Sequence, residues 1–238
     1  MGENEPKKYR EVPAQPVTPL VLAVDTTHEF GSVALAAGAE TIEEVLLHAP
    51  AGFGHVLYGH LSQLLGRHGL TPAAIDCFAA AAGPGSFTGV RVGLACVKGL
   101  AEAVQKPAAG VGNLEAMATF GTGPLRAVVM DARRGEVYGA VYDAAGRVVS
   151  PEVVAKFPAW LETLPAGVEF IATDFSPFRN GLAGTGFQDA PVVTVPKALA
   201  AAIARIAAAR WLRGELSDPA ALDANYVRRA DAELFWKE

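Results

Sequence analysis

The segment Gly83-Pro84-Gly85-Ser86-Phe87-Thr88-Gly89-Val90-Arg91 decides the fold, because an apolar run precedes it and a helical pattern follows it. The run at 75–82 is bounded by turn-forming residues and predicts a buried strand, although periodicity alone does not distinguish it from a buried helix. From 87 to about 104 apolar residues recur at helical spacing, and Ser86 can cap this helix through its side-chain oxygen. The segment therefore predicts a strand, a glycine turn and a helix in succession.

A turn of this kind can bind an anion, since it directs backbone N–H groups and the positive end of a helix at one point. This turn contains neither the lysine of a P-loop nor the spacing of a dinucleotide-binding fingerprint. We therefore treat Gly83, Pro84 and Gly85 as a candidate phosphate loop and keep ordinary packing as the alternative.

A second candidate loop follows the apolar run at 20–24, which predicts a buried central strand. The run ends at Asp25, Thr26 and Thr27, a hydroxyl-rich turn that carries one acid. Such a turn could bind a hydrated metal ion or a phosphate. The alternative is that Asp25 and Thr27 satisfy amides of the turn itself, and the residues alone do not decide between these readings.

The rest of the pattern combines strands and helices, and it restarts at Gly121-Thr122-Gly123-Pro124 with a new strand that ends at Asp131. Further strands are expected at 31–37, 41–47, 107–111, 125–130, 136–142 and 168–173, and helices at 53–68, 114–120, 157–164 and 197–212, the last preceded by a lead-in segment at 191–195. This order predicts an α/β protein with mixed sheets and flanking helices. The expected organisation is a mobile tail at 1–18, an N-terminal lobe at 19–120, and a C-terminal lobe with its tail at 121–238.

Two of the expected helices offer a candidate partner surface. The helix at 53–68 has a leucine stripe, and the helix at 87–104 has a face of small residues that would let another helix approach closely. The residues of this surface are Leu57, Leu61, Leu64, Gly89, Gly93 and Val97. The alternative is that the same faces cover the chain's own sheet.

Composition limits the function classes. The chain has 238 residues, 51% of them hydrophobic, yet it has no apolar run long enough to cross a bilayer and no signal-peptide core, so we expect a cytoplasmic protein. The formal net charge is −5 and no basic run exceeds a pair, so the chain alone should bind nucleic acid only weakly. Cys77 and Cys96 lie in apolar or small-residue segments and are expected to be buried thiols.

No metal-binding or catalytic residue is predicted. His55 and His60 are five residues apart, which places them roughly 140° apart around a helix, whereas a chelating helical pair needs a spacing of four. His48 and His68 have no acidic or sulfur neighbours at ligand spacing, and we interpret them as solvated or capping residues.

Four segments taken together resemble the TsaB (YeaZ) family. They are Asp25-Thr26-Thr27, GPGSFTGVRVGL at 83–94, DARRGEVY at 131–138 and YVRRADAE at 226–233. The resemblance spans nearly the whole chain after the tail. It implies a duplicated actin-like fold of the ASKHA, ribonuclease H-like type. It also implies a non-catalytic role in threonylcarbamoyl modification of the tRNA adenosine beside the anticodon.

The resemblance further implies two partners, the transferase TsaD and the ATPase TsaE. It implies a homodimer when the chain is alone and tRNA contact only through the complex. No cofactor is assigned from the sequence, and binding of ATP or ADP at the junction with TsaD is left open. The alternative is an ASKHA-fold enzyme: a TsaD-like transferase, a glycoprotease-like peptidase or a small-molecule kinase. The segment at 110–117, GVGNLEAM, lacks the paired-histidine motif of TsaD, and 171–176 has no adenosine-binding glycine motif. Both observations favour the non-catalytic partner.

Overall fold

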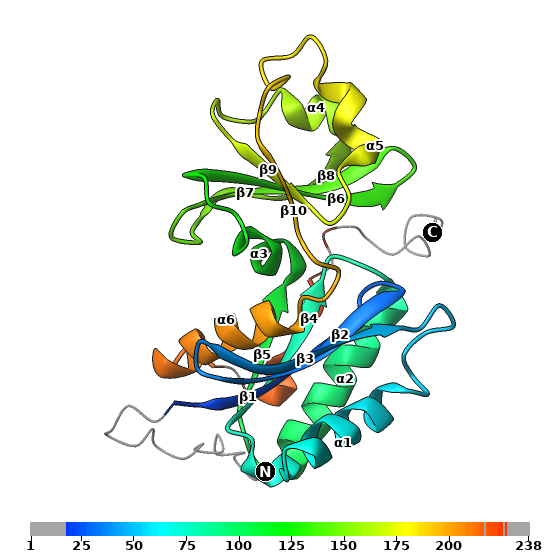
Figure 1. Ribbon diagram of the computed structural model, residues 1–238, viewed down its shortest axis with the longest axis vertical. Helices are drawn as coiled ribbons and strands as arrows, with labels where there is room; N and C mark the ends of the chain where they lie inside the picture. The colour runs from blue at the N-terminus through cyan, green and yellow to red at the C-terminus, as the bar shows by residue number, and fades with distance from the viewer. Residues whose placement is uncertain (1–17, 217, 226, 228–238) are drawn as a thin grey trace, which may run out of the picture.

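The computed structural model describes residues 18–216, 218–225 and 227. They form two five-stranded sheets, each with its own helices, in two lobes (Figure 1). The predicted tail at 1–18, apart from Thr18, and the predicted tail motif at 226–233, apart from Val227, lie outside the described residues.

The first sheet has the strand order β3-β2-β1-β4-β5. β1, β2 and β3 pair antiparallel in succession, and β4 and β5 run parallel to β1. The strands are β1 (Leu20–Asp25), β2 (Phe30–Ala37), β3 (Glu40–His48), β4 (Cys77–Gly83) and β5 (Ala108–Gly112). β1 and β4 are apolar along almost their whole length because helices cover both faces of the sheet at these central strands.

The second sheet repeats this arrangement. Its order is β10-β9-β6-β7-β8, so β6, β7 and β8 correspond to β1, β2 and β3, and β9 and β10 run parallel to β6. The strands are β6 (Leu125–Arg133), β7 (Glu136–Asp143), β8 (Val148–Lys156), β9 (Glu169–Ala172) and β10 (Val192–Thr194). The prediction of a duplicated α/β fold is confirmed.

β8 has no counterpart among the strands expected from the sequence. Its residues, VVSPEVVAK, do not alternate cleanly and contain Pro151, which removes a backbone donor. The structure shows why a proline is tolerated there: β8 is an edge strand that pairs only with β7 among the described strands.

The buried side chains form three groups, each packed between helices and one or both of the sheets. α1 (Leu57–Arg67) and α2 (Phe87–Ala103) cover one face of the first sheet, and α6 (Ala200–Leu212) and α3 (Asn113–Ala118) cover the face toward the second lobe. α4 (Phe157–Leu161) and α5 (Ser176–Arg179) pack an aromatic cluster on the outer face of the second sheet. Single 3-10 turns lie at Pro72–Ala74 (η1), Asn180–Leu182 (η2) and Pro219–Ala221 (η3). Among the described helices, none combines the length and the apolar character needed to cross a membrane.

Two helices begin later than predicted. α1 begins at Leu57 because the segment before it, which contains Gly52 and Gly54, forms a turn that places the Phe53 ring against Gly31. α6 begins at Ala200, where its first amides meet acceptors on the first sheet.

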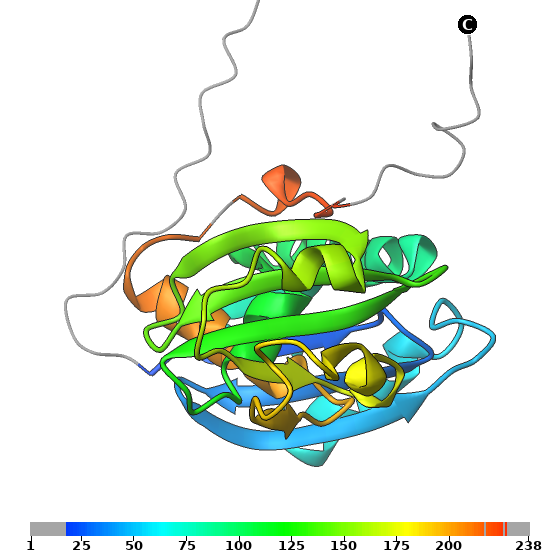
Figure 2. The same ribbon diagram turned by 90° about the horizontal axis from the view of Figure 1, so that it is seen from above.

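α6 corrects the predicted lobe boundary, because it returns to the first lobe although it follows the second sheet in the chain (Figures 1 and 2). Ser32 Oγ accepts hydrogen bonds from Leu199 N at 3.1 Å and from Ala200 N at 2.9 Å. At the other end of the helix, Arg210 donates to both carboxylate oxygens of Glu115 on α3. The alanine-rich face of α6 packs against small side chains of β1 and β2, so the first sheet has no complete core without it.

The turn between the lobes is organised by one buried acid. Glu169 Oε2 accepts hydrogen bonds from Thr122 N at 2.8 Å and Gly123 N at 3.0 Å, and Oε1 accepts one from the Thr122 hydroxyl at 3.2 Å. A buried carboxylate needs such donors, since burying an unpaired charge is costly.

We expect Glu169→Gln to lower the free energy of unfolding by about 1 to 2 kcal/mol, the difference between charge-assisted and neutral hydrogen bonds. Urea unfolding at neutral pH measures the change. Glu162→Gln, on the exposed end of α4, is the matched control and should stay within about 0.5 kcal/mol of the parent. Equal stabilities of the two variants would contradict the role assigned to Glu169.

Candidate functional site

The turn after β1 is held by its own side chains. Asp25 Oδ1 accepts hydrogen bonds from Thr27 N at 2.9 Å and from the Thr27 hydroxyl at 2.7 Å. All three residues of the turn, Asp25, Thr26 and Thr27, are buried. The structure therefore agrees with the reading in which the acid and the hydroxyl satisfy groups of the turn.

Asn113 connects this turn to the glycine loop. Its Nδ2 donates to the Thr27 hydroxyl at 2.7 Å, and its Oδ1 accepts from Gly83 N at 3.1 Å. The ends of β1, β4 and β5 lie at the same edge of the sheet because the three strands run parallel. One fully buried amide side chain thus joins the ends of three strands.

The glycines of α2 let the helix approach the turn closely. Backbone atoms of Thr26 occupy the place that a side chain at Gly89 would need, and a Cβ at Gly93 would lie 2.6 Å from Thr26 Oγ1. The Thr26 hydroxyl donates to Gly89 O at 2.7 Å. A Cβ at Gly85 would likewise lie 2.7 Å from the Thr27 carbonyl oxygen. Glycine is therefore needed at these positions because atoms of the turn occupy the space that a Cβ would take.

The six residues named as possible phosphate-binding groups do come together, but several of their polar groups are engaged by the protein: Asp25 and Thr27 bind each other, and Thr26, Thr27 and Gly83 bind neighbouring residues. In the loop after β4, Ser86 N donates to Thr27 O at 2.7 Å. Ser86 Oγ accepts from Gly89 N at 3.3 Å, which confirms the predicted helix cap. The structure thus supports the packing alternative for Gly83, Pro84 and Gly85, and phosphate binding there stays a prediction.

A C-terminal segment crosses the same loop and reaches the second lobe. Asn225 N donates to Ala82 O at 2.8 Å, and Asn225 Nδ2 donates to Glu152 Oε2 on β8 at 2.6 Å. A Cβ at Gly83, whose φ is 106°, would lie 3.0 Å from Asn225 O. Burial raises the pKa of Glu152, and the hydrogen bonds from Asn225 and Tyr142 partly oppose that rise.

The side chains named for the partner surface need correction. Leu57, Leu61, Leu64 and Val97 are only 1%, 3%, 0% and 1% exposed, because they fill the core between the helices and the first sheet. Gly89 and Gly93 face Thr26. The stripe that is most regular in the sequence is the one that the chain's own sheet needs.

The histidines are placed as surface residues. His48 stacks on the Phe30 ring with centroids 4.4 Å apart, and His68 Nε2 lies 2.7 Å from Glu43 Oε2, where Arg67 also binds. In the described ranges, no cluster of histidine, cysteine and acidic side chains has the geometry of a metal site.

Comparisons with known proteins show which proteins the chain is similar to. A family model described as TsaD, tRNA N6-adenosine threonylcarbamoyltransferase, matches residues 54–213, which is more than half of the chain. A Bacillus subtilis protein named tRNA threonylcarbamoyladenosine biosynthesis protein TsaB is 29% identical over 92% of this chain and 98% of that protein. An Escherichia coli protein of the same name is 33% identical over 56% of this chain and 64% of that protein. The solved structure of YeaZ from Pseudomonas aeruginosa superposes with a TM-score of 0.70 at 25% identity, covering 87% of this chain and 99% of that one.

The chain belongs to the TsaB (YeaZ) family. The region matched by the family model begins just before α1 and ends after α6, so it includes the glycine loop, the turn between the lobes and the second sheet. In this TsaB-family chain, Asn113 is the member of the site that the sequence did not reveal. It is the first residue of α3, and only the pairing of β5 with β4 brings it to Gly83.

For this TsaB-family fold we expect Gly89→Ala to lower the free energy of unfolding by about 1 to 3 kcal/mol, the usual cost of overpacking. Gly99→Ala is the matched control on the same helix. Its added methyl group meets open space, so it should raise stability by roughly 0.5 to 1 kcal/mol. Urea unfolding of both variants measures the difference. If both substitutions stabilise the protein, the contact between α2 and the Thr26 turn has been misassigned.

The two cysteines should react slowly in the folded TsaB-family protein. Burial raises the pKa of Cys77 to about 12, and the charge of Asp76 adds to that rise. Burial also raises the pKa of Cys96 to about 11, against a hydrogen bond with Tyr58. Because the thiolate is the reactive form, a colorimetric thiol reagent at pH 8 should modify both cysteines rapidly only after unfolding. Rapid modification of the native protein would contradict this expectation.

Proposed function

We propose that the chain acts in the biosynthesis of threonylcarbamoyladenosine in tRNA, as a partner of TsaD that does not itself transfer the group. TsaE is the accompanying ATPase in this proposal. The observation that carries it is the match to the TsaB protein of Bacillus subtilis, which extends over 92% of this chain and 98% of that protein. A match over both lobes supports a shared role better than a shared motif would.

The site at the ends of β1, β4 and β5 supports a structural rather than a catalytic role. Asp25 is engaged by Thr27, and Thr27 and Gly83 are engaged by Asn113. These contacts make the edge of the first sheet rigid and place α2 firmly against it. A rigid support for α1 and α2 is what a protein needs if its partner binds those helices.

The outward faces of α1 and α2 are the partner surface in this proposal, in place of the buried stripe. Gly59 and Gly66 on α1 and Gly99 on α2 have open space where a side chain would point, and Ala95 is exposed between the turns of α2. Tyr58 is 58% exposed beside them. Two helices with small outward residues can pack closely against a second helix pair.

The same outward surface serves self-association in the absence of TsaD, so the homodimer and the TsaD complex exclude each other. tRNA reaches the chain only through the complex, because a net charge of −5 provides little attraction for phosphates. ATP or ADP, where it binds, lies at the junction with TsaD.

The proposal predicts that Ala95→Arg weakens binding to purified TsaD at least tenfold, about 1.4 kcal/mol, because a long charged side chain would enter a close helix contact. Tag capture measures binding, and threonylcarbamoyl transfer to tRNA by TsaD with TsaE and the other pathway components measures activity. Ala159→Arg, on the exposed side of α4, adds the same charge far from α2 and should leave both unchanged.

The outcomes separate the two parts of the proposal. Normal binding by Ala95→Arg would overturn the assigned surface. Transfer that does not depend on this chain would overturn the function. Transfer by the purified chain without TsaD would favour the enzyme alternative.

A further inference from the structure

A cleft between the lobes remains outside the proposed function. It has a volume of about 120 Å³ and is lined from both lobes. The lining residues are His28, Phe30, Met117, Met130, Thr173, Lys197 and Leu199. An apolar cavity of about 150 Å³ accommodates one benzene molecule, so this cleft suits a ligand of roughly one ring and not a nucleotide.

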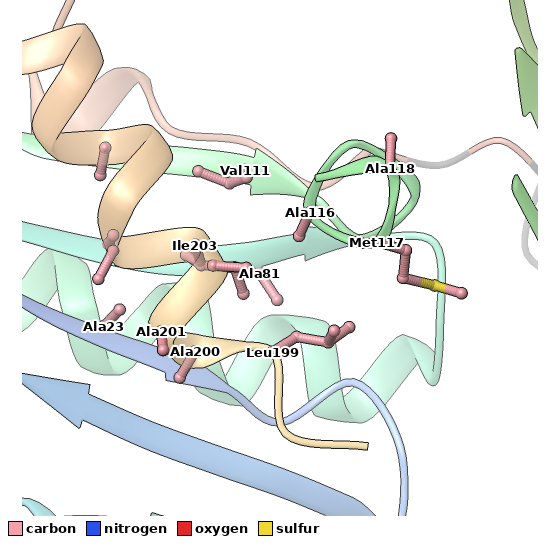
Figure 3. Close-up of a cluster of buried hydrophobic side chains, with 14 of the residues drawn as sticks. Ala23, Ala81, Val111, Ala116, Met117, Ala118, Leu199, Ala200, Ala201 and Ile203 are labelled. Carbon is pink, nitrogen blue, oxygen red and sulfur yellow. The ribbon is translucent and has the colours of Figure 1, made fainter. Parts of the chain in front are cut away.

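The walls of the cleft are apolar and adaptable. Met117 and Leu199 extend from α3 and from the start of α6 into the same region, as Figure 3 shows, and Met130 contributes from the second sheet. Methionine side chains fit bodies of different shape because they are unbranched and polarizable. These walls favour the hydrocarbon part of a small molecule.

One cation at the cleft has no acidic partner. Lys197 Nζ lies 3.9 Å from the centroid of the Phe30 ring, which fixes the ammonium group by a cation–π contact. Within the part of the chain that the structure describes, this group forms no ion pair. Hydrogen bonds from Ser176 lower the pKa of Asp174, and the charge of Lys197 adds to that effect without a direct contact.

Two further polar groups face the cleft unengaged. Among the described residues, neither the Thr173 hydroxyl nor the His28 imidazole has a hydrogen-bond partner. Desolvation lowers the pKa of His28, the charge of Asp25 opposes this shift, and the charge of Arg133 adds to it. The Asp25 carboxylate is engaged by Thr27, and Lys197 is the cation among the residues that line the cleft.

We propose that this cleft binds a small organic monocarboxylate with an apolar body. Lys197 and Thr173 hold the carboxylate, and Met117, Met130 and Leu199 enclose the body. The arrangement has the composition of a ligand site, with apolar walls and a few convergent polar groups. It is independent of the contact with TsaD, because the outward faces of α1 and α2 lie on the opposite face of the first sheet.

Methionine methyl groups provide a direct readout. The chain has three methionines, two of which line the cleft. We would label the full chain with 13C at the methionine methyls, assign the signals with Met117→Leu and Met130→Leu, and titrate with benzoate. The expected result is a saturable shift of the Met117 and Met130 signals. Benzyl alcohol, which lacks the charge, should bind more weakly.

Lys197→Met tests the charge while keeping the length of the side chain, and its exposed position should leave the fold intact. We expect benzoate to bind this variant about tenfold more weakly, as for the loss of one charge-assisted hydrogen bond. Lys98→Met on α2 removes the same charge elsewhere and should bind benzoate as the parent does. If circular dichroism shows that Lys197→Met is unfolded, Thr173→Val replaces it, with weaker binding again expected.

Three outcomes would overturn the proposal. The first is that the two signals do not respond to benzoate or respond without saturation. The second is equal affinity of the parent and the folded Lys197 or Thr173 variant. The third is that ADP shifts the same signals at lower concentration than benzoate does, because the site would then be built for a different class of ligand.

Discussion

The contact between α2 and the backbone of Thr26 is the constraint on which the first lobe depends. A helix normally keeps the width of a side chain between itself and its neighbours, but Gly89 and Gly93 remove that width, and the turn after β1 fills the space. The Thr26 hydroxyl then reaches Gly89 O, and Ser86 N reaches Thr27 O. Because these bonds form at the start of α2, they fix both the position of the helix and its rotation. The leucines of α1 pack against the surface that α2 and the sheet provide.

Local pattern was enough to predict most of the elements in the first lobe and the restart of the pattern in the second, since buried strands and amphipathic helices leave clear periodicities. It was not enough to distinguish the two faces of α2. Gly89, Gly93 and Gly99 look alike in the sequence, yet the first two touch the turn and the third faces open space. That distinction requires knowledge of what lies opposite each residue. For the same reason the leucine stripe of α1 was assigned to a partner when the chain's own core uses it.

Features that depend on distant parts of the chain could not be predicted from short windows. Asn113 acquires its role only when β5 pairs with β4, and β8 is recognisable as a strand only beside β7. The cleft could not be predicted from the sequence either, because its wall residues come from five separate segments and none of these segments carries a motif. The glycine loop shows that one pattern can serve two purposes. Atoms packed against Gly83, Gly85 and Gly89 account for the glycines, while phosphate binding by the loop stays a prediction.

The return of α6 has a consequence for how the protein is made. The alanine face that closes the first sheet lies at Ala200–Leu212, after the whole of the second sheet. When the ribosome has synthesised the first five strands, the face formed by Val21, Ala23 and Ala34 still has no cover from α6. The core of the first sheet therefore cannot be completed before α6 has been synthesised. Although the two sheets share one topology, they are not separable folding units, because the first sheet uses a helix that follows the second in the chain.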